Sequence, residues 1–372
     1  MLNNYLIIGL VPYLLLLLNW LRGIQRLGII SNSSKRGINQ ACSIVIAFRN
    51  EQNQLGKLVE SLKAQNLDRN QLEVLFIDDH SEDDGFNLLK EVCLNNKRFH
   101  LHKLENGKGK KAAIRKGVEL AKHELIITTD ADCRFNEDWA STLLTNFVAQ
   151  KLDFLTAPVS FYGNSFWSKL FNIEQGALMA ATAGSIGNSN GFICNGANMM
   201  FRKADYLKLS NKDLKAELAS GDDVFLLHAL KKLKGKHARF SFLKDRKATV
   251  RTGFPDSLHL FIEQRLRWAK KSKAYDDRDA WVQSAILVSA SLLQLFALVL
   301  FLMNYISLSH LLFVFLLKYL GDIVLLSAVK PWFKLKGLFP NSILLAILYP
   351  LYSLLIAFLS LFYHPKWKGR KA

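Results

Sequence analysis

Four long apolar segments constrain the fold of this chain more than any other feature of its sequence. The first is the uncharged run Tyr5–Leu21, and three more follow near the C-terminus at Trp281–Met303, Leu308–Val329 and Ile343–Phe362. An α-helix needs roughly 17 to 25 mostly apolar residues to cross the hydrocarbon core of a bilayer. The sequence therefore predicts an integral membrane protein. We expect a transmembrane anchor at residues 1–24 and a C-terminal transmembrane region of about three helices at residues 281–363.

The first apolar segment is expected to be an uncleaved anchor rather than a signal peptide. A signal peptide carries basic residues before its apolar core and small residues at a cleavage site after it. Here no basic residue precedes Tyr5, whereas Arg22 and Arg26 follow the apolar run. An anchor that stays in the membrane fits this pattern better.

Charges beside the apolar segments predict the orientation in the membrane. Basic residues flank the first and third segments at Arg22, Arg26, Lys35, Arg36, Lys330, Lys334 and Lys336. By the positive-inside rule, they place the central region in the cytosol, at the cytoplasmic membrane in a prokaryote. The basic tail KWKGRKA conflicts with this, because one span before and three after the central region would put the tail outside. The conflict disappears if one C-terminal segment only dips into the bilayer or lies along it.

Two opposite charges interrupt the third apolar segment. Lys318 and Asp322 are four residues apart, so on a helix they lie on one face and can pair. They form either a neutral structural pair or a functional polar spot inside the membrane. The sequence leaves both interpretations open.

The overall charge is strongly basic, with 49 Lys and Arg against 31 Asp and Glu and a formal net charge of +18. This charge suits nucleic acid, an anionic membrane face or a phosphorylated substrate. Nucleic acid is not expected as a partner, because the charge is scattered and no recognised binding motif appears. The four cysteines are widely spaced without a C-x-x-C pair, which argues against zinc ribbons and disulfide scaffolds and fits a reduced cytosolic face.

The central region, residues 40–253, has the pattern of one α/β domain that follows a hinge at Ser31–Gln40. Apolar runs that end in polar residues predict buried strands in CSIVIAFRNE, LEVLFIDDHSEDD and ELIITTDADC. Segments with helical spacing lie between them. Strands that alternate with helices predict a parallel sheet, whose ligands gather at the carboxyl ends of the strands.

Acidic residues follow two of these predicted strands. Asp130 and Asp132 are two residues apart, so in an extended segment both carboxylates can face one divalent ion that carries phosphate oxygens. An Asx-rich turn is the structural alternative. Asp78 and Asp79 either cap the next helix or accept hydrogen bonds from a ribose or a base.

Further polar motifs also have two interpretations each. The basic turn GKGKKAAIRKG lacks the Walker A spacing, and either it is solvated or its Lys110 or Lys111 meets a diphosphate at a helix start. In ASGDDVF, Asp223 is a candidate general base, or Ser220 or Asp222 caps a helix. The loop CNGAN is either a binding surface or an ordinary turn.

The stretch HLFIEQRLRWAKKSK predicts an amphipathic helix, and we expect an interfacial segment at residues 254–276. A basic helix on a membrane surface accounts for the lysines. It does not account for Gln264, Arg267 and Trp268.

The order of these motifs resembles the membrane-bound family 2 glycosyltransferases. The order is a strand-end Asp pair, a Lys-Gly turn, D-x-D, a small polar loop, G-D-D and then Q-R-L-R-W before membrane spans. The chain is similar to the branch with three aspartate motifs and Q-x-x-R-W, which includes cellulose, hyaluronan and poly-N-acetylglucosamine synthases and ceramide glucosyltransferases. The resemblance covers about residues 43–273. It implies a GT-A fold with a mostly parallel central sheet, a nucleotide-sugar donor and inversion at the anomeric carbon.

The resemblance also implies roles for residues of the central region. Asp130 and Asp132 would bind Mg²⁺ or Mn²⁺, with Asp132 the closer ligand. The nucleotide would be contacted by Ala47, Asn50 and Glu51, by Asp79 at the uracil or ribose, and by Lys110 and Asp130 near the diphosphate.

Carried over in the same way, Asp223 matches the last acid of the family's T-E-D motif and would be the general base. This chain has G-D-D there, which leaves the role of Asp222 open. Gln264, Arg267 and Trp268 match Q-x-x-R-W, in which Arg supports the diphosphate and Trp forms a wall of the acceptor site.

Together these features predict a membrane-anchored, cytosol-facing, inverting hexosyltransferase. It would transfer a sugar from a UDP-sugar to a lipid or lipid-linked acceptor, in the synthesis of a cell-envelope glycolipid or polysaccharide. A compact processive polysaccharide synthase with a glycan acceptor is the alternative within this class. A noncatalytic membrane scaffold with a nucleotide-binding fold is the alternative from another class, and the complete set of acids and Q-R-L-R-W argues against it.

Overall fold

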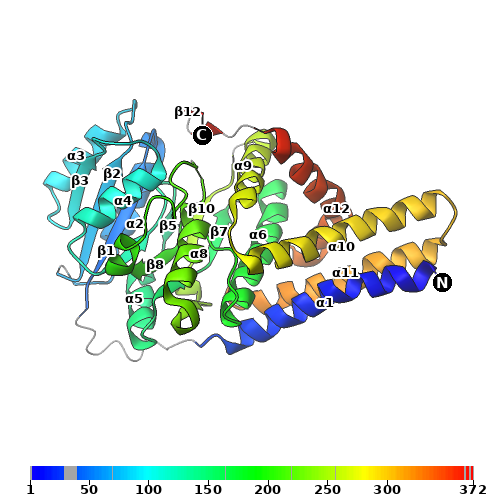
Figure 1. Cartoon of the computed structure of the whole chain (residues 1–372). Coiled ribbons are helices and arrows are strands. Elements are labelled where there is room, and N and C mark those ends of the chain that lie inside the picture. Colours follow the sequence, from blue (N-terminus) through cyan, green and yellow to red (C-terminus); the bar gives the residue numbers. More distant parts are fainter. Residues whose placement is uncertain are drawn as a thin grey trace. The chain divides into compact units, whose positions relative to one another are not determined.

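The computed structural model describes residues 2–28, 40–68, 70–163, 165–218, 220–255, 257–363, 366–367 and 370–371. Most of the expected hinge, with Lys35 and Arg36, lies outside these residues. The chain divides into two compact units (Figure 1). The sheet unit comprises residues 27–162, 193–253 and 366–372, and the helical unit comprises residues 1–26, 163–192 and 254–365.

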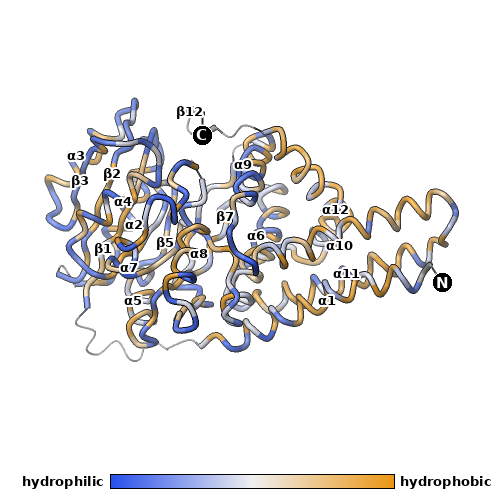
Figure 2. Tube along the Cα trace, in the orientation of Figure 1, coloured by the Kyte–Doolittle hydropathy of each residue, from blue (hydrophilic) through white to orange (hydrophobic). Residues whose placement is uncertain are grey.

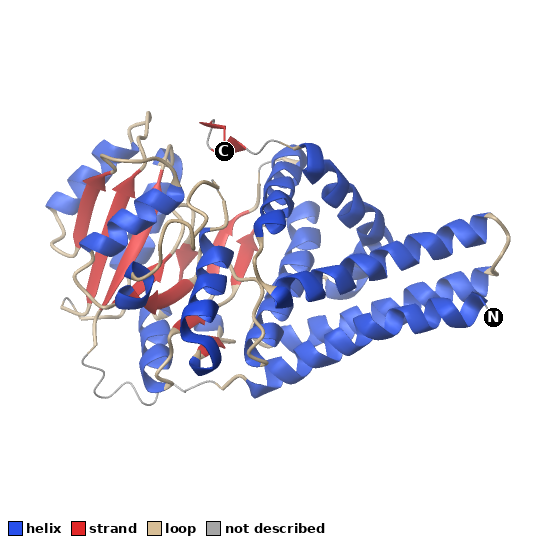
Figure 3. Cartoon of the chain, viewed as in Figure 1, coloured by secondary structure: helices blue, strands red, loops and turns tan. Residues whose placement is uncertain are grey.

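The sheet unit is built on a seven-stranded sheet with the strand order β3-β2-β1-β4-β8-β6-β9 (Figure 3). In chain order these strands are β1 (Cys42–Phe48), β2 (Leu72–Asp78), β3 (Phe99–Lys103), β4 (Leu125–Thr128), β6 (Phe154–Thr156), β8 (Met199–Arg202) and β9 (Phe240–Phe242). Strands β1 to β4 pair in parallel, and only β8 runs antiparallel to its neighbours β4 and β6. The expected mostly parallel sheet is confirmed.

Helices cover both faces of this sheet. They are α2 (Gln52–Lys63), α3 (Gly85–Leu94), α4 (Lys110–Leu120), α5 (Trp139–Ala149), α7 (Lys203–Leu207) and α8 (Asp222–Lys234). Ile44 and Ile46 pack into one core with Leu58 of α2, whereas Val45 packs into another with Val118 of α4. Successive strand residues point to opposite faces, so a sheet buried on both faces requires the uninterrupted apolar runs of the sequence.

Two small sheets complete the described strands. One joins β5 (Arg134–Phe135), β7 (Val159–Tyr162) and β10 (Val250–Gly253) in the order β5-β10-β7. The other is the antiparallel pair β11 (Lys366–Trp367) and β12 (Arg370–Lys371). In the three-stranded sheet, β5 begins two residues after Asp132, and β10 carries Thr252, which contacts Asp132.

The helical unit contains α1 (Leu2–Arg26), α6 (Phe166–Gly187), α9 (Leu258–Lys271), α10 (Arg278–Leu302), α11 (Leu308–Val329) and α12 (Leu338–Phe362). Four of these helices, α1, α10, α11 and α12, are long and apolar enough to cross a membrane. Figure 2 shows mostly apolar residues along the middle of these helices. The four apolar segments of the sequence are therefore helices, as expected, and α12 begins five residues earlier than its predicted segment, at Leu338.

Helix α6 packs tightly against α1 through glycines. A Cβ atom on Gly184 would lie 2.4 Å from Cβ of Trp20, and one on Gly23 would lie 1.9 Å from the carbonyl oxygen of Gly184. Only residues without side chains allow the two backbones to approach so closely. This contact makes the middle segment of the chain, residues 163–192, part of the helical unit.

The two charges in α11 form a pair. Lys318 Nζ lies 2.8 Å from Asp322 Oδ2, and the hydroxyl of Tyr13 in α1 also donates to Asp322. These groups line a cavity of about 130 Å³ that is otherwise mostly apolar, with Leu287, Leu325 and similar side chains. The structural alternative for Lys318 and Asp322 therefore has direct support, because each charge has a partner of opposite sign.

Candidate active site

The acidic motifs of the sheet unit lie at the carboxyl ends of neighbouring parallel strands. Asp78 is the last residue of β2, Asp79 follows it, and Asp130 and Asp132 follow β4. Strands β2 and β4 both pair in parallel with β1, so their carboxyl ends lie at the same edge of the sheet. Open α/β sheets bind their ligands at this edge.

Two carboxylates at this edge fit a hard divalent cation. One potential ligand atom each from Asp130, Asp132 and Cys133 lies within 4.8 Å of the others. Thr252 of β10 donates a hydrogen bond of 2.7 Å to Asp132 Oδ2 and so orients this carboxylate. Mg²⁺ and Mn²⁺ prefer oxygen ligands, which the two aspartates supply.

Cys133 does not fit the same ion. The thiol is completely buried, and this burial, with the nearby charges of Asp132 and Asp130, raises the pKa of Cys133 well above its usual value. The group is therefore a neutral thiol at physiological pH. A neutral sulfur is a poor ligand for Mg²⁺ or Mn²⁺.

Lys110 connects the D-x-D motif to the G-D-D motif. Its Nζ atom lies 2.7 Å from Asp130 Oδ1 and 2.8 Å from Asp222 Oδ2. Burial alone would favour the neutral amine, but the two carboxylates outweigh it and raise the pKa of Lys110 above its usual value. A permanent positive charge is thereby held between two acidic motifs at the start of α4.

Lys111, the other lysine considered for a diphosphate, has a different environment. Its Nζ donates to the backbone carbonyls of Leu214 at 3.1 Å and Lys215 at 2.6 Å. It thus ties α4 to the segment before α8. Lys110 forms ion pairs with both acidic motifs, as given above.

The two acids of G-D-D are the first residues of α8 and neither is its N-cap. The N-cap residue is Gly221, with a φ of 90° and no side-chain capping bond. The structural alternative, in which Ser220 or Asp222 is the N-cap, is therefore not what the structure shows. The left-handed backbone before the helix requires glycine, so Asp222 becomes the first helical residue and turns its carboxylate to Lys110.

Asp223 is held by the small polar loop. Its Oδ2 atom accepts a hydrogen bond of 3.3 Å from the amide of Gly196, and its Oδ1 accepts one of 2.7 Å from the amide of Val224. A Cβ atom on Gly196 would lie 2.8 Å from Asp222 Oδ2, so this close approach needs glycine. The sequence leaves the role of this loop open, and it carries no local signal for the contact with Asp223.

Asn198 of the same loop has a structural role. Its side chain is fully buried, donates to the carbonyls of Pro158 at 2.9 Å and Ala248 at 2.8 Å, and accepts from Trp139 at 3.1 Å. These bonds hold the loop against the buried residues of the sheet unit. The loop is therefore both an ordered turn and the support of an acidic motif.

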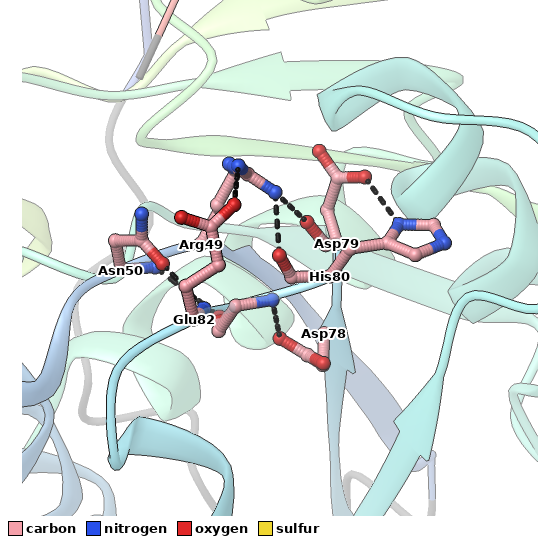
Figure 4. A network of polar contacts seen from close by, with 7 residues as sticks. Arg49, Asn50, Asp78, Asp79, His80 and Glu82 are labelled. Carbon is pink, nitrogen blue, oxygen red and sulfur yellow. Dashed lines mark hydrogen bonds and ion pairs between the residues drawn. The ribbon is translucent and has the colours of Figure 1, made fainter. Parts of the chain in front are cut away.

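A polar network joins the loops after β1 and β2 (Figure 4). Arg49 is buried and donates to the carbonyls of Asp79, at 3.1 Å, and His80, and it pairs with Glu82 at 2.8 Å. Asn50 accepts from the amide of Glu82 at 2.8 Å. The network holds the fully buried carboxylate of Asp79, whose Oδ1 lies 3.2 Å from His80 Nδ1.

The structure brings the residues expected at the nucleotide to this network. Ala47 lies near the end of β1, Asn50 lies in the loop, with a φ of 52°, and Glu51 precedes α2. Asp79 follows β2. Their contact with a nucleotide stays a prediction. Arg49, which was not singled out from the sequence, contacts Asp79, His80 and Glu82 and so joins the two loops.

The Q-x-x-R-W residues lie on α9 of the helical unit. Gln264, Arg267 and Trp268 are partly buried, and the most buried cation of the motif is Arg265. Arg265 pairs with Glu174 of α6 at 2.9 Å, and its guanidinium lies 4.4 Å from the ring centroids of both Phe261 and Trp268. Arg265, which occupies an unspecified position of Q-x-x-R-W, therefore holds the motif in place within the helical unit.

The mostly parallel sheet, with D-x-D and G-D-D motifs joined by a lysine at its carboxyl edge, fits the expected GT-A fold. Residues 43–209 match the family described as Glycosyl transferase family 2. Over these residues, which are fewer than half of the chain, the sequence is similar to family 2 glycosyl transferases, and the protein is a glycosyltransferase. The predicted resemblance, fold and enzyme class are confirmed.

One solved structure supports the fold, and a second gives a weaker likeness. The chain is similar to the mannosyltransferase PcManGT from Pyrobaculum calidifontis, solved in complex with GDP-Man and Mn²⁺, with a TM-score of 0.57 and 14% identity over 93% of this chain and 99% of that one. TarS 1–349 of S. aureus, solved in complex with UDP-GlcNAc, gives a TM-score of 0.44 and 18% identity over 69% of this chain and 71% of that one. A comparison with curated proteins gives no significant match.

Proposed function

We propose that this glycosyltransferase is membrane-anchored and inverting, and that it transfers a hexose from a nucleotide sugar, UDP-linked, to a lipid or lipid-linked acceptor at the cytosolic face. The observation that carries the proposal is the cluster at the sheet edge, in which Lys110 joins Asp130 of D-x-D to Asp222 of G-D-D. The four helices long enough to cross a membrane supply the anchor. The choice of uracil rests on the family resemblance.

The donor would bind with its diphosphate at the D-x-D motif. Asp130 and Asp132 would hold Mg²⁺ or Mn²⁺, and PcManGT was solved with Mn²⁺ beside a nucleotide sugar. The metal, when bound, supplies positive charge against the diphosphate. Lys110 adds a fixed cation at the same place, and the nucleoside would extend toward Ala47, Asn50, Glu51 and Asp79.

Asp223 is the proposed general base. Asp222 is engaged by the ammonium group of Lys110, whereas Asp223 is oriented by neutral backbone amides. In the transfer step the Asp223 carboxylate accepts the proton of the acceptor hydroxyl. The hydroxyl oxygen forms a bond to the anomeric carbon as the bond from that carbon to the diphosphate breaks, which inverts the configuration.

Roles for the α9 residues are proposed from the Q-x-x-R-W motif. Arg267 would stabilise the negative charge that develops on the leaving diphosphate, since charge-assisted hydrogen bonds are strong in a site that excludes water. Trp268 would offer a flat apolar face to a sugar. Gln264 would support them from the previous turn of α9.

A lipid acceptor is favoured over a growing polymer. The described residues contain four candidate spans, which is a small number from which to form a polymer channel within one chain. A site at the membrane surface gives a lipid-linked hydroxyl or phosphate direct access. The compact polysaccharide synthase remains the second candidate. The product of the reaction, polymer instead of glycolipid, distinguishes it from the first.

Membranes that contain the protein, incubated with radiolabelled UDP- and GDP-sugars, test the proposal. Lipid and polymer products are extracted separately, and membranes with Asp132→Ala serve as the control. We expect label from a UDP-sugar in the lipid fraction of wild type only. Label in polymer would contradict the proposed lipid acceptor, and label from GDP-sugars alone would contradict uracil as the nucleobase of the donor. No label above the control would contradict the proposed reaction.

A further inference from the structure

By composition α12 is a candidate membrane span, but its contacts within the helical unit indicate that both of its ends lie on the same side of the membrane. By length and hydropathy, Leu338–Phe362 is a candidate span. If it crossed the bilayer, the basic C-terminal tail would lie on the opposite side from Arg22 and Arg26. The positions of the two ends of α12 decide between these arrangements.

The C-terminal end of α12 lies beside the end of α9. Lys270 Nζ donates to the carbonyl oxygen of Leu361 at 3.2 Å. Residues 272–277 alone connect α9 to the start of α10 at Arg278. These six residues reach at most about 20 Å, less than the roughly 30 Å of a hydrocarbon core. Leu361 therefore lies on the side of the membrane where α10 begins.

The N-terminal end of α12 lies on that same side. Helices α10 and α11 are joined by residues 303–307 only, so they cross the membrane in opposite directions and α11 ends where α10 begins. The connection from α11 to α12 carries Lys330, Lys334 and Lys336. Asn172 of α6 donates to the carbonyl of Lys334 at 3.3 Å, which holds this connection within the unit. Three lysines in so short a connection stay out of the hydrocarbon.

The second half of α12 runs alongside α9. The rings of Tyr352 and Phe261 have centroids 6.5 Å apart, and the contact of Leu361 with Lys270 lies nine residues further along both helices. Helix α9 carries six ionisable side chains, at His259, Glu263, Arg265, Arg267, Lys270 and Lys271. Such a helix lies at the surface of a bilayer, because charged groups are costly in its core.

The first half of α12 lies against the middle of α11. The hydroxyls of Tyr319 and Ser342 are 3.2 Å apart, and Lys318 Nζ lies 6.0 Å from the ring centroid of Tyr349. Pro350 separates the two halves and removes one backbone hydrogen bond from the helix. The two halves thus have different neighbours, one inside the membrane and one at its surface.

We propose that α12 does not cross the bilayer: its first half enters beside α11, and its second half returns along α9 at the membrane surface. Its exposed apolar side chains then face lipid in this surface layer, at Leu351, Leu355, Phe358 and Phe362. The basic tail lies on the side of Arg22 and Arg26, as the positive-inside rule requires. The inference rests on the proposed membrane insertion of α1, α10 and α11 but not on the reaction.

Labelling of single cysteines tests this topology. Cys93→Ala removes the one native cysteine that is not buried, and Ser33→Cys, Tyr305→Cys or Lys371→Cys is added to it. Ser33 follows α1, Tyr305 is exposed between α10 and α11, and Lys371 lies in the tail. An impermeant thiol reagent is applied to intact and to permeabilised cells, with Cys93→Ala alone as the background.

We expect position 371 to behave as position 33 does, protected in intact cells and labelled after permeabilisation, while position 305 is labelled in both. Ala372→Cys serves as a second tail position if the Lys371 variant is not expressed. Labelling of the tail together with position 305 would overturn the inference. Labelling of positions 33 and 371 in intact cells, with 305 protected, would support α12 as proposed and contradict only the cytosolic orientation.

Discussion

Neighbouring aspartates in the G-D-D motif have different partners. Asp222 lies 2.8 Å from the ammonium of Lys110, whereas Asp223 accepts from the backbone amides of Gly196 and Val224. The contact with Lys110 occupies the carboxylate of Asp222. This contact, together with the position of Asp223 in the motif, makes Asp223 the candidate for the base.

Replacing Asp223 by Asn tests this assignment. The amide keeps the shape of the side chain but cannot accept the acceptor's proton, so we expect the transfer rate at saturating donor to fall by about 100- to 10,000-fold. Affinity for the nucleoside diphosphate should stay close to wild type. Asp222→Asn is the matched control, with a smaller loss of rate because Lys110 keeps Asp130 as its partner. A near wild-type rate for Asp223→Asn would remove it as the base.

The Glu174–Arg265 pair predicts a large effect on stability. Both side chains are more than nine-tenths buried, and their closest atoms are 2.9 Å apart. Glu174→Gln leaves a buried guanidinium without its counter-charge, which should cost about 3 to 5 kcal/mol of stability. Thermal unfolding in detergent measures this loss of stability. Glu263→Gln, at a more exposed position of α9, the helix that carries Arg265, is the control. Equal Tm values for the two variants would show that the pair contributes little.

At the scale of elements, the contact of α1 with α6 depends on backbone proximity. A Cβ atom on Gly184 would meet Cβ, Cα and the carbonyl oxygen of Trp20 at 2.4, 2.5 and 2.6 Å. Two of these atoms belong to the backbone and cannot move without the helix. We therefore expect Gly184→Ala to lower stability by about 1 to 3 kcal/mol, as overpacking does.

Gly56→Ala is the matched control for this substitution. Gly56 is also helical, in α2, and a Cβ atom there meets nothing within 4 Å. Alanine favours helix over glycine, so this variant should be as stable as wild type or slightly more so. A Gly184→Ala protein that unfolds in detergent at the same temperature as Gly56→Ala would contradict the close contact.

The sequence predicted the elements whose signals are local. Apolar runs located the strands β1, β2 and β4 and the four apolar helices, because burial on both faces or in lipid requires such runs. Helix α6 had no such signal. Its small residues Gly184 and Gly187 matter only because α1 lies against them, and this is a tertiary contact.

The candidate site shows the same division. The acids were found because each follows a strand or opens a helix, and strand ends of a parallel sheet meet at one edge. The link from Lys110 to Asp130 and Asp222 and the support of Asp223 by Gly196 join distant segments, so no spacing rule predicts them. General capping preferences favour Ser and Asp and so suggested Ser220 or Asp222 as one interpretation, whereas the left-handed turn here places Gly221 at the N-cap.

At the scale of the whole molecule, the chain passes repeatedly between its two units. It leaves the helical unit after α1, returns for α6, completes the sheet unit through β10 and then forms the remaining helices. The sheet unit is therefore not formed by one continuous segment of the chain. Residues 163–192, with buried apolar side chains such as Phe171 and Met179, belong to the helical unit.

The dependence of transfer on a divalent metal tests the central claim most directly, because it depends on D-x-D, the donor and the reaction together. Transfer from a radiolabelled nucleotide sugar is measured in membranes with excess EDTA and after Mn²⁺ or Mg²⁺ is restored. We predict that EDTA abolishes transfer, that the metal restores it in wild type, and that Asp132→Ala stays inactive with the metal although it is folded. Full turnover in excess EDTA would contradict the account.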